Sequence, residues 1–240
     1  MYEIACELLK SLDEFEKKYG RTSELLKIQS VFEKFKKNYE LLREIKKSNA
    51  ELKKTYDTTI EGWGKALELR DSETEGHSHG VMDFAVKLAK EMGLNDEEIQ
   101  IISRGALLHD IGKIGIPNAI LLKQDALTED EQKIMNQHPT FGYEMLKEIS
   151  YLQPAAAAVY SHHERWDGKG YPQSLKGEKI PLSARIVAVA NHWDAHLHDR
   201  PNQKAWTREK VIKDLQEKSG KMFDPEIVKV FLGKVIDNEG

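Results

Sequence analysis

The sequence has little cysteine and no long hydrophobic run. Its 240 residues include one cysteine, Cys6, which excludes an intrachain disulfide and gives no sign of an oxidising compartment. No apolar stretch approaches the roughly 20 residues that a membrane span needs, and the first residues alternate between apolar and charged. We therefore expect a cytoplasmic chain that its own sequence neither exports nor anchors in a membrane.

An excess of basic residues is also lacking. Lysine and arginine number 36 against 40 acidic residues, so the formal net charge is -4. Proteins that bind the phosphate backbone of nucleic acids usually carry a basic surplus. We therefore expect no DNA or RNA scaffold among the partners.

Two parts of the chain differ in their chemistry. All nine histidines fall between His77 and His198. Before them, residues 3–70 are highly charged and have helical periodicity, with a break near Gly20. We expect an N-terminal helical region over residues 1–65 and a second domain over residues 66–240.

The second N-terminal helix carries an imperfect heptad repeat. Its seam runs through Ile28, Phe35, Leu42 and Asn49, and continues to Tyr56 and Trp63. A buried Asn49 favours a parallel homodimer, because its amide is satisfied by the same residue of a partner in register. The alternative is a solvated Asn49 on a helix that packs back on its own domain.

The second domain shows no sustained alternation of period two, so we expect it to be all-α. Its helices are predicted over 78–92, 96–111, 128–148, 151–164, 182–197, 207–218 and 224–236.

Several segments of this domain are rich in metal-ligating side chains. In "ALLHDIGKIGIP", His109 and Asp110 end an apolar run, where a buried carboxylate needs a cation, and Lys113 follows on the same helical face. A buried ion-pair cluster of these three side chains is the alternative.

Further candidates occur on both sides of this segment. Glu73 and His77 have the spacing of one helical face, and His138 precedes a proline, which favours an extended backbone there. His162 and His163 open "HHERWDGKGYP", a stretch poor in both helix and strand formers. Adjacent side chains on a helix point about 100° apart, which favours two neighbouring metals over one metal that binds both.

The candidate ligands are too numerous for one ion with open positions. They are imidazoles and carboxylates without a thiolate, which suits iron, manganese or zinc. We expect at least two metals, with Asp110 best placed to bridge them. Such a centre is typical of phosphodiester hydrolysis, in which Lys113 would stabilise the non-bridging phosphate oxygens.

These motifs resemble the HD-GYP family, a branch of the HD metal-dependent phosphohydrolases. The resemblance runs in order over about residues 66–232, through "LRDSETEGHS", "LLHDIGKIGIP", "ILLKQDALTEDE", "MNQHPTFGYEML", "HHERWDGKGYP", "SLKGEKIPLSARIVAVA" and "FDPEIV". It implies an HD-type helical bundle that hydrolyses cyclic di-GMP to pGpG and then often to GMP. The implied cofactors are two or three divalent ions, with iron or manganese usual.

The resemblance also assigns roles to residues. The implied ligands are Glu73, His77, His109, Asp110, His138, His162 and His163, and Glu73 matches the carboxylate of members with three metals. Gly170-Tyr171-Pro172 is the loop that names the family and lies near the site or a partner surface. Arg200 matches a position that contacts the nucleotide in relatives.

One segment departs from the family pattern. Where relatives read A-D-x-F-D-A and then D-R-P-Y-R, this chain reads "ANHWDAHLHDRPNQK". Asn191 replaces the carboxylate that closes the metal site, and an amide is a weaker ligand. His192, His196 and His198 crowd the segment, and either one of them replaces that ligand or all three lie on the polar surface of a helix end.

Three functions follow from these observations. The first is a cyclic di-GMP phosphodiesterase. The second is a receptor or partner-binding module that has lost activity through Asn191. The third is a hydrolase of another cyclic dinucleotide, which the residues after Arg200 suggest.

Overall fold

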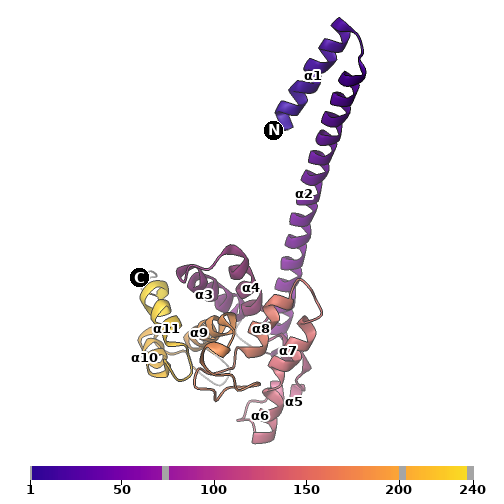
Figure 1. The fold of residues 1–240 in the computed structure, drawn as a ribbon. Helices are drawn as coiled ribbons and strands as arrows, with labels where there is room; N and C mark the ends of the chain where they lie inside the picture. The colour runs from indigo at the N-terminus through magenta and orange to yellow at the C-terminus, as the bar shows by residue number, and fades with distance from the viewer. Residues whose placement is uncertain (1, 72–75, 200–203, 237–240) are drawn as a thin grey trace. The chain divides into compact units, whose positions relative to one another are not determined.

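A computed structural model describes residues 2–71, 76–199 and 204–236. The contacts divide the chain into two units, Met1–Asp57 and Thr58–Gly240. The described residues form helices and no β-strand, which confirms the all-α prediction (Figure 1). No described helix is long and apolar enough to cross a membrane. The predicted domain boundary near residue 65 stays a prediction.

The first unit is an antiparallel helical hairpin. Helix α1 (Tyr2–Tyr19) turns at Gly20, whose φ is 87°, and packs along the beginning of α2 (Ser23–Asp71), as Figure 1 shows. The Tyr2 ring stacks on Tyr39 at 4.7 Å, and Gln29 donates hydrogen bonds to Asp13 and Glu16. The predicted break near Gly20 is confirmed.

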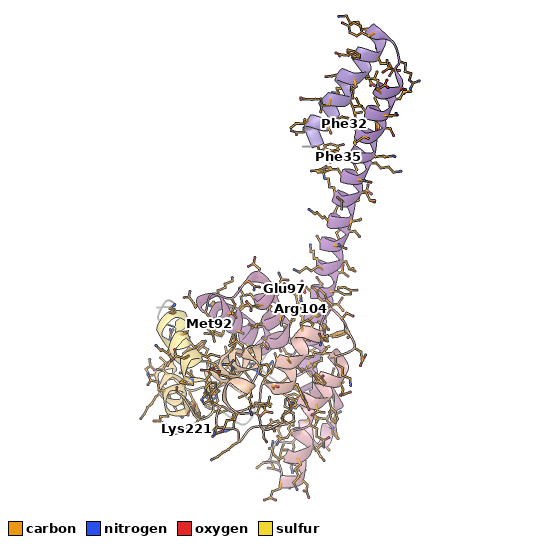
Figure 2. The ribbon with its side chains drawn as sticks, viewed as in Figure 1. Phe32, Phe35, Met92, Glu97, Arg104 and Lys221 are labelled. Carbon is orange, nitrogen blue, oxygen red and sulfur yellow. The ribbon has the colours of Figure 1, made fainter. Side chains whose placement is uncertain are left out.

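Helix α1 leaves the heptad seam of α2 open. Ile28 is 45% exposed and Leu42 57%, and Phe35, labelled in Figure 2, is 37% exposed. Within the first unit α1 therefore does not bury the seam, and the homodimer stays a prediction.

The second unit is built around α9 (Leu182–Leu197), which packs against α3 (His77–Glu91), α4 (Asp96–Leu107) and α8 (Gln153–Ser161). Val189, Ala190 and Trp193 of α9 are buried in the main core. The remaining elements are η1 (Ile111–Gly115), α5 (Asn118–Leu121), α6 (Glu129–Met135), α7 (His138–Leu146), η2 (Gly177–Lys179), α10 (Arg208–Lys218), α11 (Pro225–Val230) and the π-helix η3 (Phe231–Ile236).

Capping residues set several helix starts. Asn95 accepts hydrogen bonds from the first turn of α4, and Glu98 reaches back to the Asn95 backbone. Thr128 and Glu131 form the same reciprocal pair before α6. Such boxes satisfy the free amides of a helix start, so these two starts could be read directly from the sequence.

Three predicted helices are interrupted. The helix predicted over 96–111 ends at Leu107 and is followed by the 3-10 helix η1, the one predicted over 128–148 divides into α6 and α7, and the last divides into α11 and η3. The first break has a packing cause. A Cβ on Gly112 would lie 1.9 Å from the His138 carbonyl oxygen, so glycine lets η1 approach the start of α7. This approach brings Asp110 and His138 together.

Candidate metal centre

Asp110 lies at the middle of the candidate site, between the end of α4 and η1. Its Oδ1 lies 3.1 Å from His138 Nε2 and 3.6 Å from His162 Nε2. Its Oδ2 lies 3.2 Å from His109 Nε2. The two oxygens thus face different histidines, which is the arrangement that a carboxylate between two cations requires.

Two groups of ligand atoms share this carboxylate. His77, His109 and Asp110 form one group, and Asp110, His138, His162 and His163 form the other. Within each group the ligand atoms lie within 4.8 Å of one another. The structure therefore brings together all the predicted histidine ligands, from α3, the end of α4, the start of α7 and the end of α8.

Backbone carbonyls fix the orientation of three of these rings. Nδ1 of His109 bonds the Ala106 carbonyl at 2.7 Å, Nδ1 of His138 the Met135 carbonyl at 2.9 Å, and Nδ1 of His162 the Val159 carbonyl at 2.8 Å. A carbonyl only accepts, so we assign the proton to Nδ1 in each ring. When the ring is neutral, its Nε2 then presents a lone pair to Asp110.

The resulting cluster is a convergence of acceptors. His138 Nε2 and His162 Nε2 lie 3.3 Å apart, and both lie close to the Asp110 carboxylate. Lone pairs and a carboxylate at such distances repel one another unless a proton or a cation lies among them. The donor set therefore fits divalent metal ions with nitrogen and oxygen ligands.

Burial favours the metal-ligating protonation states. It lowers the pKa of His162 to about 4 and holds that of His163 well below its usual range. Burial alone would raise the pKa of Asp110, but His109 and Lys113 outweigh it and hold this pKa well below the usual range. At His162 and His163 this leaves neutral imidazoles beside an ionised carboxylate, which suits nitrogen ligation of a cation.

A second carboxylate orients His77. Asp194 of α9 is buried, and its Oδ2 lies 2.5 Å from His77 Nδ1. A carboxylate on Nδ1 fixes the ring and leaves Nε2 for a ligand. The sequence reasoning missed Asp194, although a carboxylate between Trp193 and Ala195 on an apolar helix was the available signal.

The paired histidines, His162 and His163, belong to the same ligand group. Their binding to separate metals, which helical geometry favoured, stays a prediction. The helix α8 ends at Ser161, so the two residues lie in a turn and their ring centroids are only 4.1 Å apart. His138 departs from its predicted extended backbone, because it forms the first residue of α7.

The loop after the paired histidines folds over His163. The Tyr171 ring stacks on the His163 ring with centroids 4.8 Å apart, and burial raises the pKa of Tyr171. The buried Glu164 carboxylate accepts hydrogen bonds from the backbone amides of Gln173 and Leu175. This loop therefore lies beside the site, and Tyr171 borders the candidate centre.

The remaining predicted residues have different outcomes. Lys113 Nζ lies 2.8 Å from Asp110 Oδ2, as its spacing predicted. Asn191 is half-buried on α9, one turn before Asp194. Glu73 and Arg200 lie outside the described residues.

The three additional histidines do not join the two ligand groups found among the described residues. His192 Nε2 lies 2.7 Å from Asp214 Oδ2 of α10, and His196 Nδ1 bonds the His192 carbonyl. His198 Nδ1 lies 3.6 Å from the Asp194 carboxylate that orients His77. His192 is therefore engaged by Asp214 and belongs to neither ligand group.

Residues 63–227 match the HD domain family. The chain belongs to the HD domain family. Because the match covers more than half of the 240 residues, the resemblance seen in the motifs is confirmed at the level of the family. The HD domain contains every ligand candidate of this chain from Glu73 to Asn191.

Two relatives with named activities are similar to this chain. The cyclic di-GMP phosphodiesterase response regulator RpfG of Xanthomonas campestris is 40% identical over 89% of this chain and 57% of its own length. The 3'3'-cGAMP-specific phosphodiesterase 2 of Vibrio cholerae is 35% identical over 76% of this chain and 35% of its own. The chain thus spans about half, or less, of these relatives.

A solved structure shares the fold. The crystal structure of the cyclic GMP-AMP specific phosphodiesterase V-cGAP3 of Vibrio cholerae superposes with a TM-score of 0.61 and 20% identity. The superposition covers 75% of this chain and 48% of the V-cGAP3 chain. The predicted HD-type helical bundle is therefore confirmed.

Proposed function

We propose that this HD domain hydrolyses cyclic di-GMP through two or three divalent metal ions, with iron or manganese best suited to the ligands. The observation that carries the proposal is the convergence of histidine Nε2 atoms on both oxygens of Asp110. Relatives named as cyclic dinucleotide phosphodiesterases support it. Bound there, the ions would supply Lewis acidity to the phosphate and to the attacking water.

The chain's own residues perform the remaining tasks. Asp110 keeps its negative charge at neutral pH and holds the two ligand groups together. The Lys113 ammonium, beside Asp110, would face the non-bridging phosphate oxygens and stabilise their growing charge. Water adds to phosphorus as the bond to the 3' oxygen breaks, giving pGpG, and a second hydrolysis gives GMP.

Two further contacts belong to the proposed substrate site. Tyr171, over His163, would close the site beside a guanine or phosphate group. Arg200 would contact the nucleotide, as the family pattern implies. The Glu73 carboxylate would be a ligand of a third metal ion.

The test is turnover by the full chain loaded with manganese or iron under anaerobic conditions. We expect cyclic di-GMP to be converted to pGpG, and Asp110→Asn to remove turnover together with bound metal. His196→Gln is the matched control, because this histidine lies outside both ligand groups. Turnover that persists after complete metal removal would contradict the proposal.

A hydrolase of another cyclic dinucleotide is the second candidate. It is favoured by the relative named as a 3'3'-cGAMP-specific phosphodiesterase and by Asn202 and Gln203 in place of the usual tyrosine and arginine. Equimolar cyclic di-GMP and 3'3'-cGAMP in one reaction decide between the two, because the substrate with the higher kcat/KM is consumed first. The third candidate, a receptor, predicts binding of both without cleavage.

The exposed seam of α2 supports a homodimer. Val31, Ile45 and Leu52 are 64%, 47% and 50% exposed, and they share the seam with Asn49. A second copy in register would cover these side chains and pair the two Asn49 amides. The Gly170-Tyr171-Pro172 loop is a candidate surface for a different protein partner.

A further inference from the structure

The last turn of α2 makes direct contacts with the segment that carries Lys113. Arg70 donates from Nη1 to the Lys113 carbonyl at 2.7 Å and from Nη2 to the Ile116 carbonyl at 2.7 Å. Nη2 also lies 3.0 Å from Asn118 Oδ1. One guanidinium therefore spans η1 and the start of α5.

The neighbouring residue contacts the Lys113 side chain itself. Asp71 Oδ2 lies 3.2 Å from Lys113 Nζ, and Asp110 Oδ2 lies 2.8 Å from the same nitrogen. The Asp71 side chain is only 2% exposed and that of Lys113 13%. The ammonium thus lies between two carboxylates, one of which belongs to the candidate metal centre.

These contacts address a physical weakness of lysine as a functional group. Its ammonium is carried on four flexible methylenes, and η1 is a 3-10 helix of five residues with few internal hydrogen bonds. A side chain on such a segment samples many positions unless other groups hold it. Arg70 holds the backbone at Lys113, and Asp71 holds the ammonium.

The same turn also contacts the segment that carries His77. Glu68 accepts hydrogen bonds from the backbone amides of Gly76 and Ser78, at 3.2 and 3.0 Å. The start of α3 and η1 are thus both bound to the last turn of α2. This turn therefore links two segments that contribute to the candidate centre.

We propose that Arg70 and Asp71 are positioning residues that act through Lys113 and set where its ammonium meets the substrate phosphate. The proposal rests on the proposed function, because that function places Lys113 beside the phosphate. The competing interpretation is a purely structural clamp, in which the two residues only attach α2 to the rest of the second unit.

Kinetics of the full metal-loaded chain separate these interpretations. Asp71→Asn keeps the size of the side chain and removes its charge, and we expect kcat to fall about 10- to 100-fold, as displacements near 1 Å do. Metal content and KM should change little, because no predicted metal ligand is altered. In the Lys113→Ala background the same change should have almost no effect on kcat, since the group through which it acts is gone.

Asp224→Asn is the matched control. It breaks the Arg185–Asp224 ion pair at 2.5 Å, which is also buried but lies outside both ligand groups. We expect it to lower the midpoint of thermal unfolding and leave kcat unchanged. If Asp71→Asn leaves kcat unchanged as well, or lowers it equally with and without Lys113, the positioning role is wrong.

Hydrogen exchange gives a readout that does not depend on activity. Arg70→Lys keeps the charge but removes the planar guanidinium that donates to the Lys113 and Ile116 carbonyls. Backbone amides in the peptide covering residues 109–117 should therefore exchange faster. If the wild type cleaves no cyclic dinucleotide but this exchange accelerates, the proposed function fails, while the hold of Arg70 on the Lys113 backbone is supported. Unchanged exchange in an active enzyme would overturn the positioning role of Arg70.

Discussion

At the scale of single residues, the candidate site depends on groups whose charge the fold sets in advance. Neutral His162 and His163 face an ionised Asp110, and their Nδ1 or ring contacts fix the direction of the ligand atoms. Ligand atoms with fixed directions favour binding of metal ions whose coordination geometry matches those directions. Asn191 is a neutral amide at the position where the resemblance to the HD-GYP pattern implies a carboxylate.

Asn191→Asp should strengthen metal binding. The change restores a carboxylate on α9, one turn before Asp194, and we expect affinity for manganese to rise about tenfold or more. Competition with a fluorescent chelator measures it. Asn202→Asp, a change of the same charge outside the ligand motifs, serves as the control, and equal effects of the two would show that general charge alone is responsible.

The buried histidines predict how the metal-free protein responds to acid. The folded pKa of His162 is about 4, below the ordinary 6.5, and that of His163 is also lowered. The unfolded chain therefore binds more protons between about pH 6.5 and 4, and stability falls as pH falls through this window. Each histidine contributes a slope of at most about 1.4 kcal/mol per pH unit.

Urea unfolding of the chelated protein at several pH values tests this expectation. His162→Gln should flatten the slope between pH 6.5 and 4, because one of the three histidines with a lowered pKa, which include His192, is gone. A slope that is unchanged in His162→Gln would show that other groups cause the acid sensitivity.

At the scale of elements, the site depends on the close approach of η1 to α7. The hypothetical Cβ of Gly112 overlaps the His138 carbonyl, so Gly112→Ala should destabilise the fold by about 1–3 kcal/mol and weaken metal binding. Gly62→Ala is the control, because nothing lies within 4 Å of that Cβ and α2 should gain stability. Thermal unfolding and metal titration distinguish the two, and equal behaviour would contradict the packing argument.

The sequence predicted these elements unequally, for physical reasons. Helix starts at Asn95 and Thr128 were readable because their caps are local. The interruption after Leu107 was not, since the chain bends there to meet His138, which is distant in sequence. Likewise His109, Asp110 and His162 were found by residue type, whereas Asp194, Arg70 and Asp71 function through contacts that spacing does not reveal.

At the scale of the whole molecule, the open seam of α2 predicts self-association. Ile45→Glu should convert a dimer to a monomer, because it places a charge on the seam beside Asn49 of each copy. Lys47→Glu is the control, since its side chain is 79% exposed and lies off the seam. Sedimentation equilibrium measures both, and a dimer that withstands Ile45→Glu would place the interface elsewhere.

The central claim is that the histidines around Asp110 hold a metal centre that cleaves a cyclic dinucleotide despite Asn191. The most direct test is one anaerobic sample of manganese- or iron-loaded protein, with metal content and the products of cyclic di-GMP determined together. We predict two or more metal ions per chain and conversion to pGpG or GMP. Two bound ions without cleavage of cyclic di-GMP or 3'3'-cGAMP would contradict the claim.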